Sequence, residues 1–196
     1  MSPLKTSLLL EAYPADTPLA SSGGGSDGCP HAAAKPLILG VGNLLMGDEG
    51  VGVAAIRRLE QAGFSTRAEL VDGGTGGFHL LGLFRRRRHI ILIDAAADGR
   101  HAGTVSLIKP RYACDFPPSL TAHDIGLKDL LESAALLGDL PQVDLITISI
   151  GGLGAMTLEL SSAVAASLER VEALVQECLQ GMDAAGLAHE SAVAPT

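Results

Sequence analysis

Residues 40–52 have the sequence GVGNLLMGDEGVG, in which two adjacent acids, Asp48 and Glu49, stand inside a glycine-rich turn. An apolar run at residues 37–39 precedes this turn, and apolar residues at helical spacing follow it as far as Leu59. The stretch therefore predicts a strand, a tight turn and a helix, which is the opening unit of an α/β fold.

The turn does not match the glycine-rich loops that bind nucleotides. A dinucleotide-binding fingerprint requires its third glycine at position 45, where this chain has Leu45. A P-loop requires Lys and then Ser or Thr after Gly47, whereas Asp48 and Glu49 stand there and would repel a phosphate. The two acids favour cation chemistry, and saturable binding of a nucleotide by the purified protein would contradict this interpretation.

Composition narrows the class of protein further. The chain has 196 residues, of which 47% are hydrophobic, so it is long and apolar enough for one folded core. Its net charge of -8 argues against nucleic acid or an anionic membrane as the partner. The cysteines, Cys29, Cys114 and Cys178, lie far apart and form no CxxC motif. We therefore expect a soluble, cytoplasmic protein without a zinc ribbon, a disulfide framework or a membrane span.

The composition changes along the chain and predicts its organisation. Residues 1–34 are rich in Gly, Ser and Pro and are predicted to be a disordered extension. Residues 35–181 are predicted to form the folded domain, and residues 182–196 a flexible C-terminal tail. Within the domain, strand-like and helix-like segments alternate, which is typical of a parallel sheet. The predicted strands are residues 37–42, 67–71, 89–94, 104–109 and 143–150. The first predicted helix follows the glycine-rich turn and ends near residue 63, and the other predicted helices contain residues 80–84, 126–137 and 164–178.

Acidic side chains follow three of the predicted strands. Asp48 and Glu49 come after the first strand, Asp72 ends the second, and Asp94 ends the third. Because ligands bind outside the carboxyl ends of the strands in an open parallel sheet, these acids are expected at one rim. His123, in a loop before a predicted helix, is a candidate imidazole ligand. Clustered carboxylates indicate a shared cation or acid–base chemistry, and with imidazole they suit nickel or zinc better than calcium.

Each of these residues also has a structural interpretation. Asp48 is a suitable N-cap for the first helix, and Glu49 is an acid that the helix dipole favours in a first turn. Asp72 precedes two glycines, where turn residues are common, and His123 is a common type of helix-entry residue. Asp94 is costly to bury at the end of an apolar strand without a purpose. Their joint placement favours a functional site.

Three segments of the chain resemble the maturation endopeptidases of nickel-iron hydrogenases. They are residues 40–52, 72–75 and 121–127, with Asp94 between the second and the third, and the resemblance extends from about residue 36 to about residue 179. It implies a three-layer α/β sandwich in which a five-stranded, mostly parallel, twisted sheet lies between helices. It also implies that Glu49, Asp94 and His123 contact the metal, with Asp48 and Asp72 as supporting or acid–base catalytic candidates.

The resemblance further implies an activity. Such a protein removes a C-terminal peptide from a hydrogenase large-subunit precursor after nickel insertion, and the nickel is supplied by the substrate instead of being bound permanently. It is grouped with aspartic-type endopeptidases, and we expect a monomer. A non-catalytic, nickel-sensing maturation chaperone is the alternative, because Gly151 and Gly152 follow the last strand where the family usually has a proline. Normal maturation with an uncleaved precursor would favour that alternative.

Overall fold

The computed structural model describes residues 35–84, 87–110, 133, 141–152 and 156–192. The chain divides into two compact units, Met1–Ala32 and Ala33–Thr196, and all the described residues belong to the second. The predicted extension, His123 and the predicted helix at 126–137, apart from the helical residue Ser133, lie outside these ranges.

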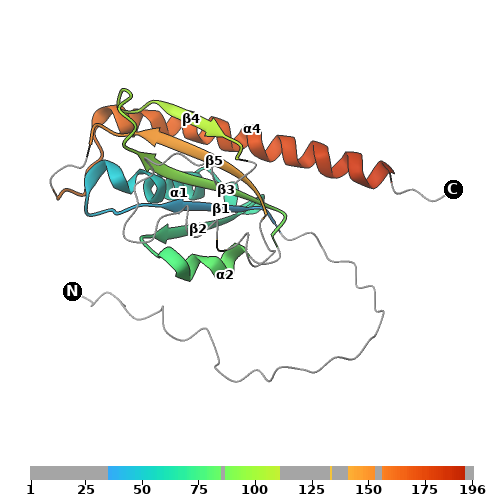
Figure 1. The fold of residues 1–196 in the computed structure, drawn as a ribbon. Helices are drawn as coiled ribbons and strands as arrows, with labels where there is room; N and C mark the ends of the chain where they lie inside the picture. Colours follow the sequence, from blue (N-terminus) through green and yellow to red (C-terminus); the bar gives the residue numbers. More distant parts are fainter. Residues whose placement is uncertain (1–34, 85–86, 111–132, 134–140, 153–155, 193–196) are drawn as a thin grey trace, which may run out of the picture. The chain divides into compact units, whose positions relative to one another are not determined.

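A five-stranded sheet with the order β2-β1-β3-β5-β4 forms the centre of the second unit (Figure 1). Its first four members in this order are parallel, and β4 is antiparallel to β5. The long central strands are apolar and buried on both faces, as expected of parallel strands covered by helices. The predicted mostly parallel sheet is therefore confirmed. The strands are β1 Leu37–Val41, β2 Glu69–Gly74, β3 His89–Ala96, β4 Val105–Ile108 and β5 Gln142–Ser149.

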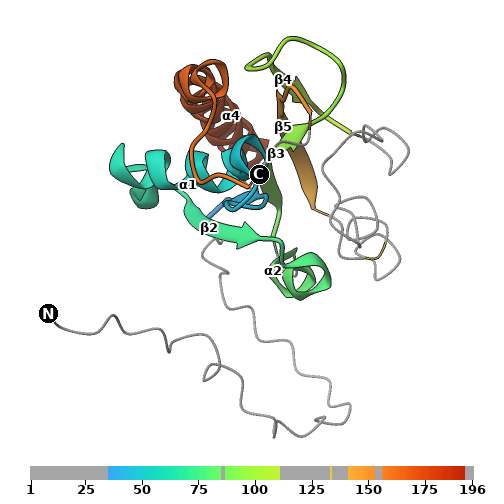
Figure 2. The ribbon, with the colours of Figure 1, turned by 90° about the vertical axis from the view of Figure 1, so that its left-hand side faces the viewer.

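Helices cover both faces of the sheet (Figure 2). Helices α1, Val51–Gln61, and α4, Ser162–Ala192, pack on one face, where Ile91 of β3 is part of their apolar core. The 3-10 turn η3, Gly77–Leu80, and helix α2, Leu81–Phe84, pack on the other face in a second core. Alternate residues of each strand supply the two cores, as strand geometry requires. The predicted three-layer sandwich is thus confirmed.

Several predicted boundaries differ from the structure, among them the end of β3, which continues to Ala96, and two of the differences have a clear local cause. Strand β2 begins at Glu69 and not at Arg67, because Phe64–Thr66 forms a 3-10 turn, η2, and the Ala68 N–H donates to the Phe64 carbonyl at 3.0 Å. Helix α4 continues to Ala192, whereas the sequence placed the start of the tail at residue 182. Residues 180–192 include four alanines and no proline, so the helix continues past the predicted start of the tail.

No helix within the described ranges is long and apolar enough to cross a lipid bilayer.

Candidate functional site

The turn between β1 and α1 lies at the topological switch point of the sheet. Strand β1 has β2 on one side and β3 on the other, so the chain leaves β1 toward one edge and later returns toward the opposite edge. In open α/β sheets the crevice outside the carboxyl ends of two such strands is the usual binding site. The acids that follow β1 and end β3 are therefore in the expected place for a functional site.

Glycines in this turn allow the backbone of α1 to lie directly against the sheet. A Cβ atom on Gly52, in the first turn of α1, would lie 2.2 Å from the Val41 carbonyl oxygen and 2.4 Å from that of Ile93. A Cβ atom on Gly42, whose φ is +142°, would lie 2.0 Å from the Glu49 carbonyl oxygen. The glycine spacing therefore serves close backbone packing, and this packing positions the acidic turn over the strand ends.

Glu49 and Asp94 are both buried at the ends of neighbouring strands. Glu49 belongs to the 3-10 turn η1, Gly47–Gly50, directly after β1, and Asp94 lies near the end of β3. Each residue is only 1% exposed. The Asp94 Oδ1 atom accepts a hydrogen bond from the Ala95 N–H at 2.7 Å. Burying a carboxylate is costly unless a hydrogen bond, a cation or a proton compensates its charge. The two buried acids are therefore candidate metal-binding or acid–base groups.

Asp72 reaches the same end of the sheet but has a different environment. It is level with Gly40 of β1, yet it is exposed, and its Oδ1 atom accepts a hydrogen bond from the Gly74 N–H at 3.0 Å. Leu70 precedes it on the same strand face and packs against the α1 and α4 core. Leu92 lies two residues before Asp94 and so shares its face of β3, but Leu92 belongs to the core on the α2 side of the sheet. Asp72 and Asp94 therefore face opposite sides of the sheet, and Asp72 closes a local turn.

Asp48 connects the acidic turn to the start of α4. Its Oδ1 atom accepts a hydrogen bond from the Ser161 N–H at 2.6 Å. Ser161 precedes α4 and acts as its N-cap, since its Oγ atom accepts from the Val164 N–H at 3.4 Å. The N-cap of α1 is Gly50, so Asp48 does not cap the helix that follows it in sequence. Its negative charge instead interacts favourably with the dipole of α4.

Replacing Asp48 by Ala is expected to destabilise the protein by about 1–2 kcal/mol, because the variant loses a charge-assisted hydrogen bond at a helix start. Urea unfolding at neutral pH measures this loss. Asp48→Asn keeps an acceptor without the charge and is expected to lose less. Equal stability of the wild type and Asp48→Ala would show that the connection to α4 contributes nothing.

The predicted metal-contacting trio is placed only in part. The structure shows Glu49 and Asp94 buried at adjacent strand ends, and His123 lies outside the described residues. Within the described part of the chain, no group of at least three His, Cys, Asp or Glu residues could hold a metal ion. The trio therefore stays a prediction.

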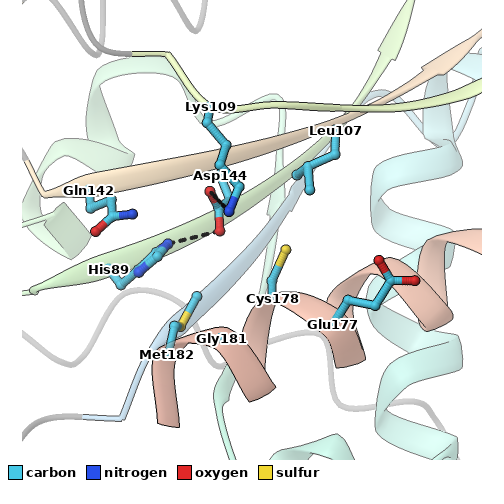
Figure 3. Close-up of a pocket in the computed structure, with 9 residues that line it drawn as sticks. All are labelled: His89, Leu107, Lys109, Gln142, Asp144, Glu177, Cys178, Gly181 and Met182. Atoms are coloured by element: carbon cyan, nitrogen blue, oxygen red, sulfur yellow. Dashed lines mark hydrogen bonds and ion pairs between the residues drawn. The ribbon is translucent and has the colours of Figure 1, made fainter. Parts of the chain in front are cut away.

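A cavity of about 270 Å³ lies at the opposite, amino-terminal end of the parallel strands (Figure 3). His89 of β3 and Asp144 of β5 line it together with Lys109, which follows β4, and Cys178 of α4. Asp144 is 1% exposed, and its Oδ2 atom lies 3.0 Å from His89 Nε2. The Lys109 ammonium is 3.7 Å from its Oδ1 atom. Sequence reasoning missed this cluster, because the apolar strand pattern around Asp144 does not reveal which residues lie beside it.

The charge of Asp144 is stabilised by its neighbours. Burial alone would raise the pKa of Asp144, but the hydrogen bond and electrostatic attraction of His89, together with Lys109 and Cys178, hold this pKa below its usual value of 3.8. Burial, with the nearby Asp144 charge, raises the pKa of the Cys178 thiol to about 11. The thiol is therefore neutral and weakly nucleophilic at neutral pH, so this cluster lacks an activated cysteine nucleophile.

Asp144 is expected to make stability depend on acid pH. Because its pKa is lower in the folded than in the unfolded chain, its contribution is complete above about pH 4 and is lost as the pH falls through the folded-state pKa. Urea unfolding between neutral pH and about pH 3 should show a shallower acid decline for Asp144→Asn, which should also be about 1–2 kcal/mol less stable at pH 7. Parallel pH profiles of the two proteins would contradict this role.

Comparison with known sequences finds proteins of hydrogenase maturation. The hydrogenase maturation protease family matches residues 53–178. Hydrogenase 2 maturation protease of Escherichia coli strain K12 is 32% identical over 148 residues, which covers 72% of this chain and 90% of that protein. The hydrogenase expression/formation protein HupD of Thiocapsa roseopersicina is 37% identical over 111 residues, but this alignment spans only 49% of its length.

Comparison with solved structures finds proteins of the same kind. The hydrogenase maturating endopeptidase HybD from E. coli matches with a TM-score of 0.66 and 30% identity, covering 76% of this chain and 93% of that one. The [NiFe] hydrogenase maturation protease HybD from Thermococcus kodakarensis matches with a TM-score of 0.62 and 26% identity, covering 74% and 99%. The similarity therefore extends over nearly the whole of both solved proteins.

Proposed function

Because the chain belongs to the hydrogenase maturation protease family, we propose that it is the endopeptidase that removes the C-terminal extension of a nickel-iron hydrogenase large-subunit precursor. The family match and the names of the similar proteins support a peptidase. The structural observation that carries the proposal is the pair of buried carboxylates, Glu49 and Asp94, at the switch point between β1 and β3. An ordinary packing role would not require two buried acids at this position.

In this proposal nickel is part of the substrate. Glu49, Asp94 and His123 contact the nickel that the precursor brings, since carboxylate and imidazole groups are suitable ligands for it. The bound metal supplies a fixed reference point for the scissile bond and polarises it. The protein contributes carboxylates that the fold has already buried and oriented, which reduces the cost of ordering them during the reaction.

The remaining acids have separate proposed roles. Asp48 holds the acidic turn against the start of α4 through the Ser161 N–H and so positions Glu49. Asp72, which is exposed and closes a turn with the Gly74 N–H, supports the rim next to β1. The proposal includes the aspartic-type grouping, with a carboxylate activating the attacking water. It also includes a monomeric protein that works in the cytoplasm.

A cleavage assay tests the proposal. The purified protein is incubated with nickel-loaded and with nickel-free large-subunit precursor, and the intact mass of each precursor is followed over time. We expect loss of a C-terminal peptide from the loaded precursor alone. Equal cleavage of both precursors would contradict the dependence on nickel but would support the peptidase activity. Maturation of the hydrogenase without any cleavage of its precursor would support the chaperone alternative.

A further inference from the structure

Three large hydrophobic side chains are exposed among the residues that the structure describes. Leu45 is 54% exposed, Met156 is 77% exposed and Leu158 is 73% exposed. Leu45 belongs to the turn that carries Glu49, and the other two belong to the segment that leads into α4. We call these three residues the apolar patch.

Backbone pairing joins the two segments of the apolar patch. Met46 and Thr157 form a parallel bridge. The Gly47 N–H donates to the Thr157 carbonyl at 2.8 Å, and the Thr157 N–H donates to the Leu45 carbonyl at 3.0 Å. Residues that precede the two members of a parallel bridge are neighbours, so Leu45 lies beside Met156. Leu45 and Met156 are therefore neighbours, and Leu158 follows two residues later on the same segment.

The apolar patch is also held in a fixed position relative to the buried acids. Gly47 has a φ of +58°, and a Cβ atom there would lie 2.8 Å from Thr157 Cγ2, so the two segments are in close contact. The hydrogen bond from the Ser161 N–H to Asp48 adds a second connection one residue from Glu49. The turn that carries Glu49 therefore presents Leu45 as its exposed side chain.

We propose that the apolar patch is the docking surface for an apolar segment of the large-subunit precursor beside its cleavage site. This inference rests on the proposed function. Solvent-exposed apolar side chains that gather at one place mark interaction surfaces. The precursor is the occupant that fits best, because the patch shares a turn with Glu49 and is continuous with the site where the precursor would be cut. Docking there places the scissile bond at a set distance from Glu49 and Asp94.

The double substitution Met156→Gln with Leu158→Gln tests this role. Gln is similar in size but polar, so docking of an apolar segment is expected to weaken and the KM for precursor cleavage to rise about tenfold or more. The kcat is expected to stay within about twofold, because uniform binding is lost without loss of transition-state contacts. The melting temperature should not change, since both side chains are exposed. Leu158→Met, which keeps an apolar side chain, is the matched control and should behave as the wild type.

Two further measurements separate the possible failures. If the wild type does not cleave, the proposed function fails, and the dissociation constant for the precursor is compared directly between wild type and double variant. A weaker constant for the variant would still support docking, whereas equal constants, or an equal KM where cleavage occurs, would overturn it. A wild-type dimer that the double substitution converts to monomer without a change in KM would show that a second copy covers the patch, and would also overturn the proposal.

Discussion

Replacing Glu49 by Gln is expected to reduce precursor cleavage by about 10²- to 10⁴-fold while leaving the protein folded. Gln has nearly the same volume, so the buried position of residue 49 stays filled, but it lacks the negative charge that metal contact or proton transfer requires. Asp94→Asn is expected to have an effect of the same order. Because both groups act on one reaction, the double variant should lose little more than either single variant.

The measurement is the rate of precursor cleavage by intact mass, with the melting temperature recorded for each variant. Glu172→Gln is the matched control, because Glu172 pairs with Arg58 at 2.8 Å on the surface and far from the acidic turn in sequence. Such a partly exposed pair contributes little to stability, so the control should cleave normally. Normal cleavage by Glu49→Gln would contradict the catalytic assignment, and unfolding of that variant would instead indicate a structural role.

Replacing Gly52 by Ala is expected to destabilise the fold by about 3 kcal/mol or more. The new Cβ atom would meet two backbone carbonyl oxygens, at 2.2 Å from Val41 and 2.4 Å from Ile93, and neither can rotate away as a side chain would. Relief of the clash requires α1 to move away from β1 and β3, which disturbs the apolar core beneath the helix. Urea unfolding monitored by circular dichroism measures the loss.

Gly181→Ala provides the matched comparison for this prediction. Gly181 lies in α4, and apart from its chain neighbours and the adjacent backbone of its own helix no heavy atom lies within 4 Å of the position of an added Cβ atom. Since Ala is the better helix former, this variant should gain up to about 1 kcal/mol. The same chemical change is therefore expected to have opposite signs at the two positions. Equal effects at Gly52 and Gly181 would show that close packing of α1 does not limit stability.

Much of the fold follows from local sequence pattern. The apolar strands and the helical spacing after the glycine-rich turn predicted the α/β class, and the position of Asp94 at the end of an apolar strand predicted a buried acid. The end of α4 was less predictable, because the apolar spacing in the sequence was followed only to Cys178, whereas the helix continues to Ala192. Periodicity reports where a helix is packed, whereas composition decides how far it continues.

The contacts of the individual acids depended on the tertiary structure. The partner of Asp48 is the N–H of Ser161, which is 113 residues away in sequence, so no local pattern identifies it. The orientation of Asp72 depends on which face of β2 each core occupies, and its sequence shows only a turn before two glycines. Asp144 required knowledge of the sheet register, because His89 becomes its neighbour only when β3 and β5 pair.

The pairing of Met46 with Thr157 also affects the order of assembly during synthesis. Glu49 and Asp94 are both made well before residue 157 leaves the ribosome, yet the turn that carries Glu49 lacks one of its backbone partners until then. The Asp48 connection likewise waits for Ser161. Contacts between segments so distant in sequence carry the largest loop-closure cost and form late in folding. The acidic turn of a growing chain therefore stays incomplete until α4 begins to dock, so a nascent or truncated protein has the acids without the fixed geometry.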